Sequence, residues 1–94
     1  MEQFKTVIVG KYKPLLNYVT ACITIFNQGE QSLTLRARGE AINNSVEVFH
    51  LLKNRFLEDV GISSVLIDGE TVTTKHGKLR HLPVLEITLH RGFK

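Results

Sequence analysis

Residues 7–19 read VIVGKYKPLLNYV and decide the fold, because they place a strand, a short loop and a helix in immediate succession. The β-branched run over residues 4–9 is typical of a strand, which Gly10 ends. Pro14 suits the first position of a helix, where its missing N–H costs nothing. The residues from Leu15 to Phe26 then favour a helix. This stretch therefore predicts a strand followed directly by the helix that packs against it.

The predicted helix ends at Asn27-Gln28-Gly29. Its apolar positions occupy more than one stripe, so we expect burial on two sides. These positions are Leu15, Leu16, Tyr18, Val19, Cys22, Ile23, Ile25 and Phe26. The single Cys22 excludes an internal disulfide and is typical of a small core residue.

Working outward, the segment from Ser32 to Arg38 alternates between apolar and polar residues, which predicts a half-buried strand ended by Gly39. Leu33, Leu35 and Ala37 would face the core, and Thr34, Arg36 and Arg38 the open side. A second helix follows, with Asn43 or Asn44 as the expected cap and Glu47 in its first turns. Its predicted apolar face runs through Val46, Phe49, Leu52 and Phe56, and Glu58, Asp59 and Gly61 mark its end.

The remainder, from Ile62 to Arg91, predicts two strands joined by a turn centred on His76-Gly77, since glycine accepts a positive φ. A two-residue loop would set Lys75 opposite Lys78, a like-charge pair that an anionic partner explains better than folding does. Each arm could extend on the order of 30 Å. Pro83 cannot donate to a ladder, so that part of the last strand should lie at an edge or beyond the main sheet. The order is βαβαββ in a single domain over residues 1–94.

Composition limits the function classes. The chain has 94 residues, 43% of them hydrophobic, and a net charge of +3, which gives a modest preference for anionic partners. No apolar run approaches the ~18 residues that span a bilayer, and the N-terminus lacks a signal-peptide layout, so we expect no membrane association and an intracellular location. No nucleotide-loop or nucleophile motif is present, and His50, His81 and His90 lack ligand spacing. We therefore expect no enzyme activity, no cofactor and no metal.

Three groups of basic residues are candidates for contact with nucleic acid. Lys11 and Lys13 precede a helix N-terminus that already favours phosphate, and Tyr12 could stack on a base or sugar or pack on the protein. Arg36 and Arg38 point the same way ~7 Å apart, near the spacing of adjacent phosphates. Lys75, Lys78 and Arg80 surround the hairpin turn. For each group the alternative is a solvated basic surface, balanced at the arginines by Glu40.

Asn54, Arg55 and Phe56 form a candidate interaction surface at the end of the second helix. Phe56 fits the core stripe of that helix, and it also suits a contact between subunits. The pattern leaves both interpretations open.

In order along the chain, several segments resemble the Alba family of archaeal chromatin proteins. They are Val7 to Val19, Phe26 to Gly29, Arg36-Ala37-Arg38-Gly39-Glu40-Ala41-Ile42, Lys53 to Leu57, and Leu85-Glu86-Ile87. The resemblance spans residues 6–91. It implies an α+β, βαβαββ two-layer sandwich similar to the C-terminal domain of bacterial translation initiation factor three, with a projecting hairpin.

The resemblance also implies a homodimer that binds double-stranded DNA without strong sequence preference, and RNA, on the chromosome in the cytoplasm. Lys11, Lys13, Arg36 and Arg38 would lie over central phosphates, and the arms bearing Lys75, Lys78 and Arg80 would enter the minor groove. Residues Asn54 to Phe56 would join dimers. Acetylation of Lys11 or Lys13, reversed by a deacetylase, would weaken binding by removing charge.

The chain departs from the family pattern where charge matters. Tyr12 is an extra residue between the loop lysines, and Glu40, Asn44 and His81 stand where basic residues are common. Two alternatives follow. The chain could serve as an RNA-binding subunit of a ribonucleoprotein, or it could pair with a more basic Alba paralogue.

Overall fold

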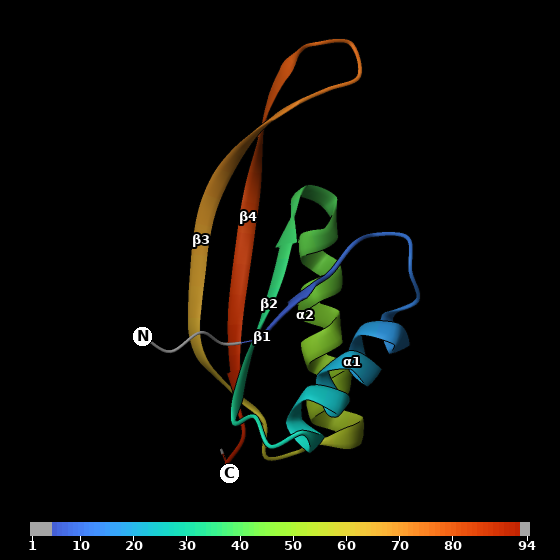
Figure 1. The fold of residues 1–94 in the computed structure, drawn as a ribbon, viewed down its shortest axis with the longest axis vertical. Coiled ribbons are helices and arrows are strands. Elements are labelled where there is room, and N and C mark those ends of the chain that lie inside the picture. The colour runs from blue at the N-terminus through green and yellow to red at the C-terminus, as the bar shows by residue number, and fades with distance from the viewer. Residues whose placement is uncertain (1–4, 93–94) are drawn as a thin grey trace.

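The computed structural model describes residues 5–92 and contains one four-stranded sheet with two helices on one face (Figure 1). The elements are β1 (Lys5–Ile8), α1 (Leu15–Asn27), β2 (Ser32–Arg38), the 3₁₀ turn η1 (Gly39–Ala41), α2 (Ile42–Leu51), the π-helical turn η2 (Leu52–Phe56), β3 (Gly61–Thr73) and β4 (Leu79–His90). The strand order is β1-β2-β4-β3. β1 runs parallel to β2, and the other neighbours are antiparallel. The predicted βαβαββ order and α+β class are confirmed. Phe4, the first residue of the predicted strand, lies outside the described residues.

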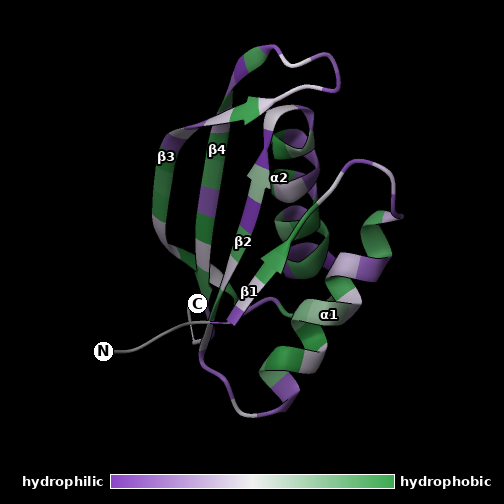
Figure 2. Ribbon diagram, turned by 45° about the horizontal axis from the view of Figure 1, so that its top comes forward, coloured by the Kyte–Doolittle hydropathy of each residue, from purple (hydrophilic) through white to green (hydrophobic). Residues whose placement is uncertain are grey.

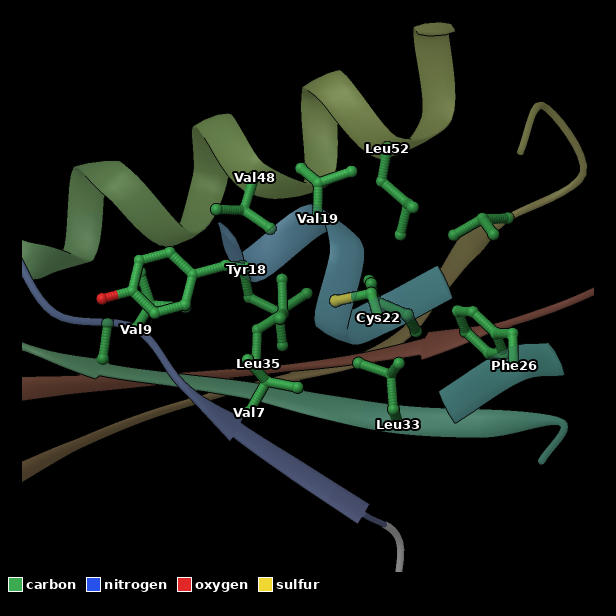
Figure 3. Packing of buried hydrophobic residues seen from close by; sticks show 14 of the residues in the cluster. Val7, Val9, Tyr18, Val19, Cys22, Phe26, Leu33, Leu35, Val48 and Leu52 are labelled. Carbon is green, nitrogen blue, oxygen red and sulfur yellow. The ribbon is translucent and has the colours of Figure 1, made fainter. Parts of the chain in front are cut away.

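The core lies between the helices and the inner face of the sheet. Leu33 and Leu35 of β2 are fully buried and meet Val19 and Cys22 of α1 and Val48 of α2 in one cluster (Figure 3). The predicted alternation of β2 is confirmed, with Leu33, Leu35 and Ala37 inward. Apolar and polar residues also alternate along β4 (Figure 2), which lies beside β2 in the sheet. Within residues 5–92, no helix covers the outer face of the sheet, so charged side chains can lie there.

Helix α1 has one buried stripe and not two. Tyr18, Val19, Cys22 and Phe26 are buried, whereas Leu16 is 56% exposed. The two-sided expectation is wrong because the sheet and α2 lie on one side of α1, and its other side faces solvent. Burial raises the pKa of the Cys22 thiol to about 12. Pro14 precedes the first helical residue as the N-cap, one position earlier than predicted.

The expected asparagine caps of α2 are wrong. The helix begins at Ile42, continuous with η1, and no side chain of the described residues caps its N-terminus. The amide of Asn44 donates instead to the carbonyl of Gly10 at 3.2 Å.

The buried ridge of α2 runs through Ser45, Val48 and Leu52. Phe49 packs partly against the core, whereas Val46 and Phe56 are about half exposed. The predicted stripe was therefore correct at Leu52 and Phe49 and wrong at Val46 and Phe56, because the ridge follows the i, i+3, i+7 positions counted from Ser45. Phe56 is not a core residue.

β3 and β4 continue past the end of β2 as a two-stranded hairpin (Figure 1). Pro83 pairs with Gly69 just beyond Val84, the last partner of β2, so the edge position expected for this proline is confirmed. Strand pairing ends at Thr73 and Leu79. Within residues 5–92, no helix is long and apolar enough to cross a membrane.

The turn at the tip is longer than expected. The N–H of Thr74 donates to the carbonyl of Lys78, the N–H of Gly77 donates to the carbonyl of Thr74, and Gly77 has a φ of +77°. Lys75 therefore lies in the turn, and Lys78 faces Thr74. The expected Lys75–Lys78 pair is wrong, because the loop contains three residues between Thr74 and Lys78.

Candidate nucleic-acid interface

The loop between β1 and α1 is held in place from both helices. The N–H of Gly10 donates to the hydroxyl of Tyr18 in α1 at 3.0 Å, and its carbonyl accepts from Asn44 in α2 at 3.2 Å. A Cβ on Gly10 would lie 3.3 Å from that tyrosine hydroxyl, which explains the glycine. These bonds direct the following residues, Lys11 and Tyr12, toward the end of β2.

Lys11 is paired with Glu40. Its ammonium donates to Glu40 Oε2 at 2.6 Å and lies 5.2 Å from the centroid of the Tyr12 ring. The hydrogen bond to Glu40 raises the pKa of Lys11, and the same bond lowers the pKa of the Glu40 carboxyl. Both groups therefore remain charged near neutral pH. Lys13 is exposed, and no carboxylate among residues 5–92 lies within ion-pair distance of it.

Arg36 and Arg38 stand on the outer face of the sheet, as predicted. The first guanidinium nitrogen of Arg36, Nη1, pairs with Glu86, its cross-strand neighbour in β4. Its second nitrogen, Nη2, donates to Glu70 Oε2 at 3.2 Å. Arg38 Nη1 donates to the other oxygen of the same carboxylate, Glu70 Oε1, also at 3.2 Å. One carboxylate from the hairpin thus bridges both arginines of β2.

Arg36, Arg38 and Glu70 line a groove of about 970 Å³ between the loop, the end of β2 and the base of the hairpin. Five of the predicted contact residues lie along it: Lys11, Tyr12, Arg36, Arg38 and Arg80. Tyr12 is 88% exposed, so its ring is not used in packing the core. The groove is large enough for a segment of a polyanion and presents guanidinium, ammonium and aromatic groups to it.

The other predicted residues lie elsewhere. Lys75 and Lys78 are exposed at the tip of the hairpin, beyond the groove. Within the described part of the chain, neither has a carboxylate at ion-pair distance. Asn54, Arg55 and Phe56 sit on η2, at the opposite end of the molecule from the tip (Figure 1). The structure thus separates a groove in which Lys11, Arg36 and Arg38 are paired with carboxylates, a basic tip without such pairs among the described residues, and a distant aromatic surface.

Sequence reasoning missed Glu70 and Glu86. Glu40 was noticed because it neighbours the arginines in the chain, whereas Glu70 lies 32 residues from Arg38. Glu86 could have been found from strand register, because an antiparallel partner of Arg36 shares its face. Among the described residues, no group of three or more His, Cys, Asp or Glu side chains is placed to hold a metal ion.

Together, the sheet, the hairpin and the basic groove define the class of small two-layer α+β domains that carry cations on an open sheet face. A family model described as Alba matches residues 5–68. The chain belongs to the Alba family, which confirms the resemblance found in the sequence.

Individual relatives agree with this assignment. Over 91 residues the chain is 36% identical to the DNA/RNA-binding protein Alba of Methanocella arvoryzae, covering 97% of this chain and 94% of that protein. Alba from Thermoplasma volcanium superposes with a TM-score of 0.86 at 33% identity, over 93% of this chain and 100% of that one. ALBA1 from Trypanosoma brucei gives a TM-score of 0.76 at 20% identity, over 98% of this chain and 73% of that one, which shows a shared fold.

Proposed function

We propose that this protein binds double-stranded DNA without sequence preference, and also RNA, as a homodimeric architectural protein of chromatin in the cytoplasm. One observation carries the proposal: Lys11, Arg36, Arg38 and Arg80 converge with Tyr12 on one groove at the base of a basic hairpin. The printed name of the Methanocella arvoryzae relative, a DNA/RNA-binding protein, supports the ligand class.

The chemistry of the groove favours backbone contact over base reading. Guanidinium and ammonium groups bind phosphates of any sequence, and such contacts fix position without carrying sequence information. The lining described for the groove includes no Asn or Gln side chain, the residues that read adenine edges. The two-stranded arm, ending in Lys75 and Lys78, would follow the duplex and enter its minor groove.

A second copy of the chain would cover the outer edge of the sheet. β3 is one of the two edge strands of the four-stranded sheet, and its consecutive residues Val65, Leu66 and Ile67 are 53%, 53% and 76% exposed. Exposed apolar side chains on an edge strand favour association with another chain. Phe56, half exposed at the far end, would join one dimer to the next on DNA.

Acetylation would act on the loop through Lys13. Its ammonium lacks a carboxylate partner among residues 5–92, whereas that of Lys11 is engaged by Glu40. Removing the charge of Lys13 would weaken phosphate binding, and a deacetylase would restore it.

A salt titration of binding to matched duplex DNA and duplex RNA tests the proposal, with the mass of the protein measured alongside. A dimer that contacts roughly 6–8 phosphates should give a slope of about −5 to −7 in log K against log salt. Absence of salt-dependent binding to either duplex would overturn the proposal. Binding that requires a second, more basic Alba chain would replace the homodimer with a heterodimer.

Tyr12 favours a second candidate, an RNA-binding subunit of a ribonucleoprotein. A ring that is 88% exposed beside a basic groove could stack on an unpaired base. Tyr12→Ala should then weaken binding to single-stranded RNA about fivefold or more, whereas Tyr12→Phe should bind as the wild type does. Equal losses on duplex DNA and single-stranded RNA would argue against stacking.

A further inference from the structure

Every cation that β2 presents to the groove is already bound to a carboxylate of the same chain. Arg36 is paired with Glu70 and Glu86, Arg38 with Glu70. An arginine nitrogen that is hydrogen-bonded to a carboxylate can bind a phosphate only if that carboxylate moves away. The inference drawn from it rests on the proposed function and concerns the affinity of the same groove.

Glu70 and Glu86 hold Arg36 in different ways. Glu86 is the direct cross-strand partner of Arg36 and lies on the same four-stranded part of the sheet. Glu70 belongs to the hairpin and pairs with Leu82, at a point where, among the described residues, β4 has passed the end of β2 and pairs with β3 alone. It reaches back to the arginines and divides its two oxygens between Nη2 of Arg36 and Nη1 of Arg38. Its carboxylate therefore occupies the position between two guanidinium groups that a backbone phosphate would take.

The Glu70 contacts can be broken. The side chains of Glu70 and Arg38 are 37% and 54% exposed, and both hydrogen bonds are 3.2 Å long. Ion pairs at this exposure contribute little to folding and are screened by salt. The core does not depend on them, because Arg36 and Arg38 project from the face of β2 opposite Leu33 and Leu35.

We infer that Glu70 competes with nucleic-acid phosphate for Arg36 and Arg38, and thereby limits the affinity of this protein. A phosphate that enters the groove must displace the Glu70 carboxylate and then lie beside it, so a like charge opposes binding. Arg36 keeps Glu86 as an orienting partner when Glu70 leaves. The groove is consequently arranged for phosphate but partly occupied by the protein's own anion.

The test compares Glu70→Gln with Glu58→Gln in the full chain, using duplex DNA and duplex RNA at fixed salt. Both substitutions remove one negative charge, but Glu58 lies just after η2, at the end of the molecule away from the hairpin. We expect Glu70→Gln to bind ~3–10-fold tighter than the wild type, and Glu58→Gln to bind within twofold of it.

A double-mutant cycle separates direct competition from a general charge effect. In an Arg36→Ala/Arg38→Ala background, Glu70→Gln should give no gain, because the groups for which Glu70 competes are absent. An equal gain in both backgrounds, or equal affinities of Glu70→Gln and Glu58→Gln, would overturn the inference while the wild type still binds. Absence of binding by the wild type and all variants would overturn the proposed function itself.

Discussion

The groove and the hairpin tip are both basic, but their cations are in different states. In the groove, Lys11, Arg36 and Arg38 are bound to carboxylates. At the tip, Lys75 and Lys78 have no such partner among the described residues. A phosphate must therefore displace a carboxylate to bind Lys11, Arg36 or Arg38, whereas at the tip it displaces only water and dissolved ions. A count of positive residues does not show which of them are free to bind a phosphate.

The difference assigns distinct roles to the two regions. Under the proposed function, the unpaired lysines on the projecting arm would supply attraction to the nucleic acid and most of the salt dependence of binding. Arg36 keeps its pair with Glu86 when Glu70 is displaced, so Arg36 would set the position of the backbone in the groove.

The largest effect is expected at the tip. Lys75→Ala/Lys78→Ala should weaken duplex DNA binding about tenfold or more near ~100 mM salt, and reduce the salt slope by about 2 for each protomer. Equilibrium titration at several salt concentrations measures both quantities. Lys5→Ala, an exposed lysine on β1, serves as a control for net charge. An unchanged slope would remove the tip from the interface.

A smaller loss is expected in the groove. Arg38→Ala should weaken binding ~3-fold, because part of the charge of its guanidinium is already neutralised by Glu70. The loss should be equal across unrelated sequences, because the proposed contact is to phosphate and not to bases. Competition between duplexes of different sequence checks this. A changed sequence preference with affinity intact would refute the phosphate assignment.

The Lys11–Glu40 ion pair should also make the free energy of unfolding depend on pH in the acid range. Lys11 lowers the pKa of Glu40 below its ordinary value of 4.5. The resulting stabilisation is present above that value and is lost as pH falls through the lowered pKa. Urea unfolding of wild type and Glu40→Gln should therefore show a small difference at pH 6 that disappears in strong acid. For Lys75→Ala/Lys78→Ala, the difference in unfolding free energy from the wild type should not disappear in acid in this way. If the difference between Glu40→Gln and the wild type persisted in acid, the Lys11–Glu40 pair would be excluded as the cause of that difference.

The smallest change is expected in the rate at which Cys22 reacts with thiol reagents, and this rate checks whether each variant is folded. Cys22 is fully buried and its thiol has a pKa of about 12, so it should resist thiol reagents near neutral pH unless the chain unfolds. Labelling followed by mass spectrometry should give equally slow modification in wild type and in the groove and tip variants. Rapid labelling of one variant would attribute its binding loss to unfolding.

Local patterns predicted the elements because their causes are local. The alternation of β2, the glycine after it and the run of helical residues after Pro14 depend on residues close in sequence. Prediction failed where a choice depended on distant neighbours. Asn44 is a good cap by type, but it bonds to Gly10, 34 residues away. Val46 and Phe56 fit a helical stripe, but the sheet lies against Ser45 and Val48 instead.

The candidate site likewise has features that could be predicted from the sequence and features that could not. The basic residues and Tyr12 were identifiable from their types and from the resemblance to the Alba family. Their gathering in one groove required β1, β2 and the hairpin to lie side by side. The position of Lys75 in the turn, away from Lys78, depended on a loop of three residues instead of two.

By itself the sequence determined the βαβαββ order, the family and the residues that carry positive charge, because these follow from residue type and short-range pattern. Only the tertiary structure decided which of those charges are available. Ion pairs form between side chains brought together by strand register and by the continuation of β3 and β4 just past the end of β2, as between Glu70 and Arg38. The energy of an electrostatic interaction depends on the distance between the two charges in space. The number of residues that separate them along the chain does not give that distance.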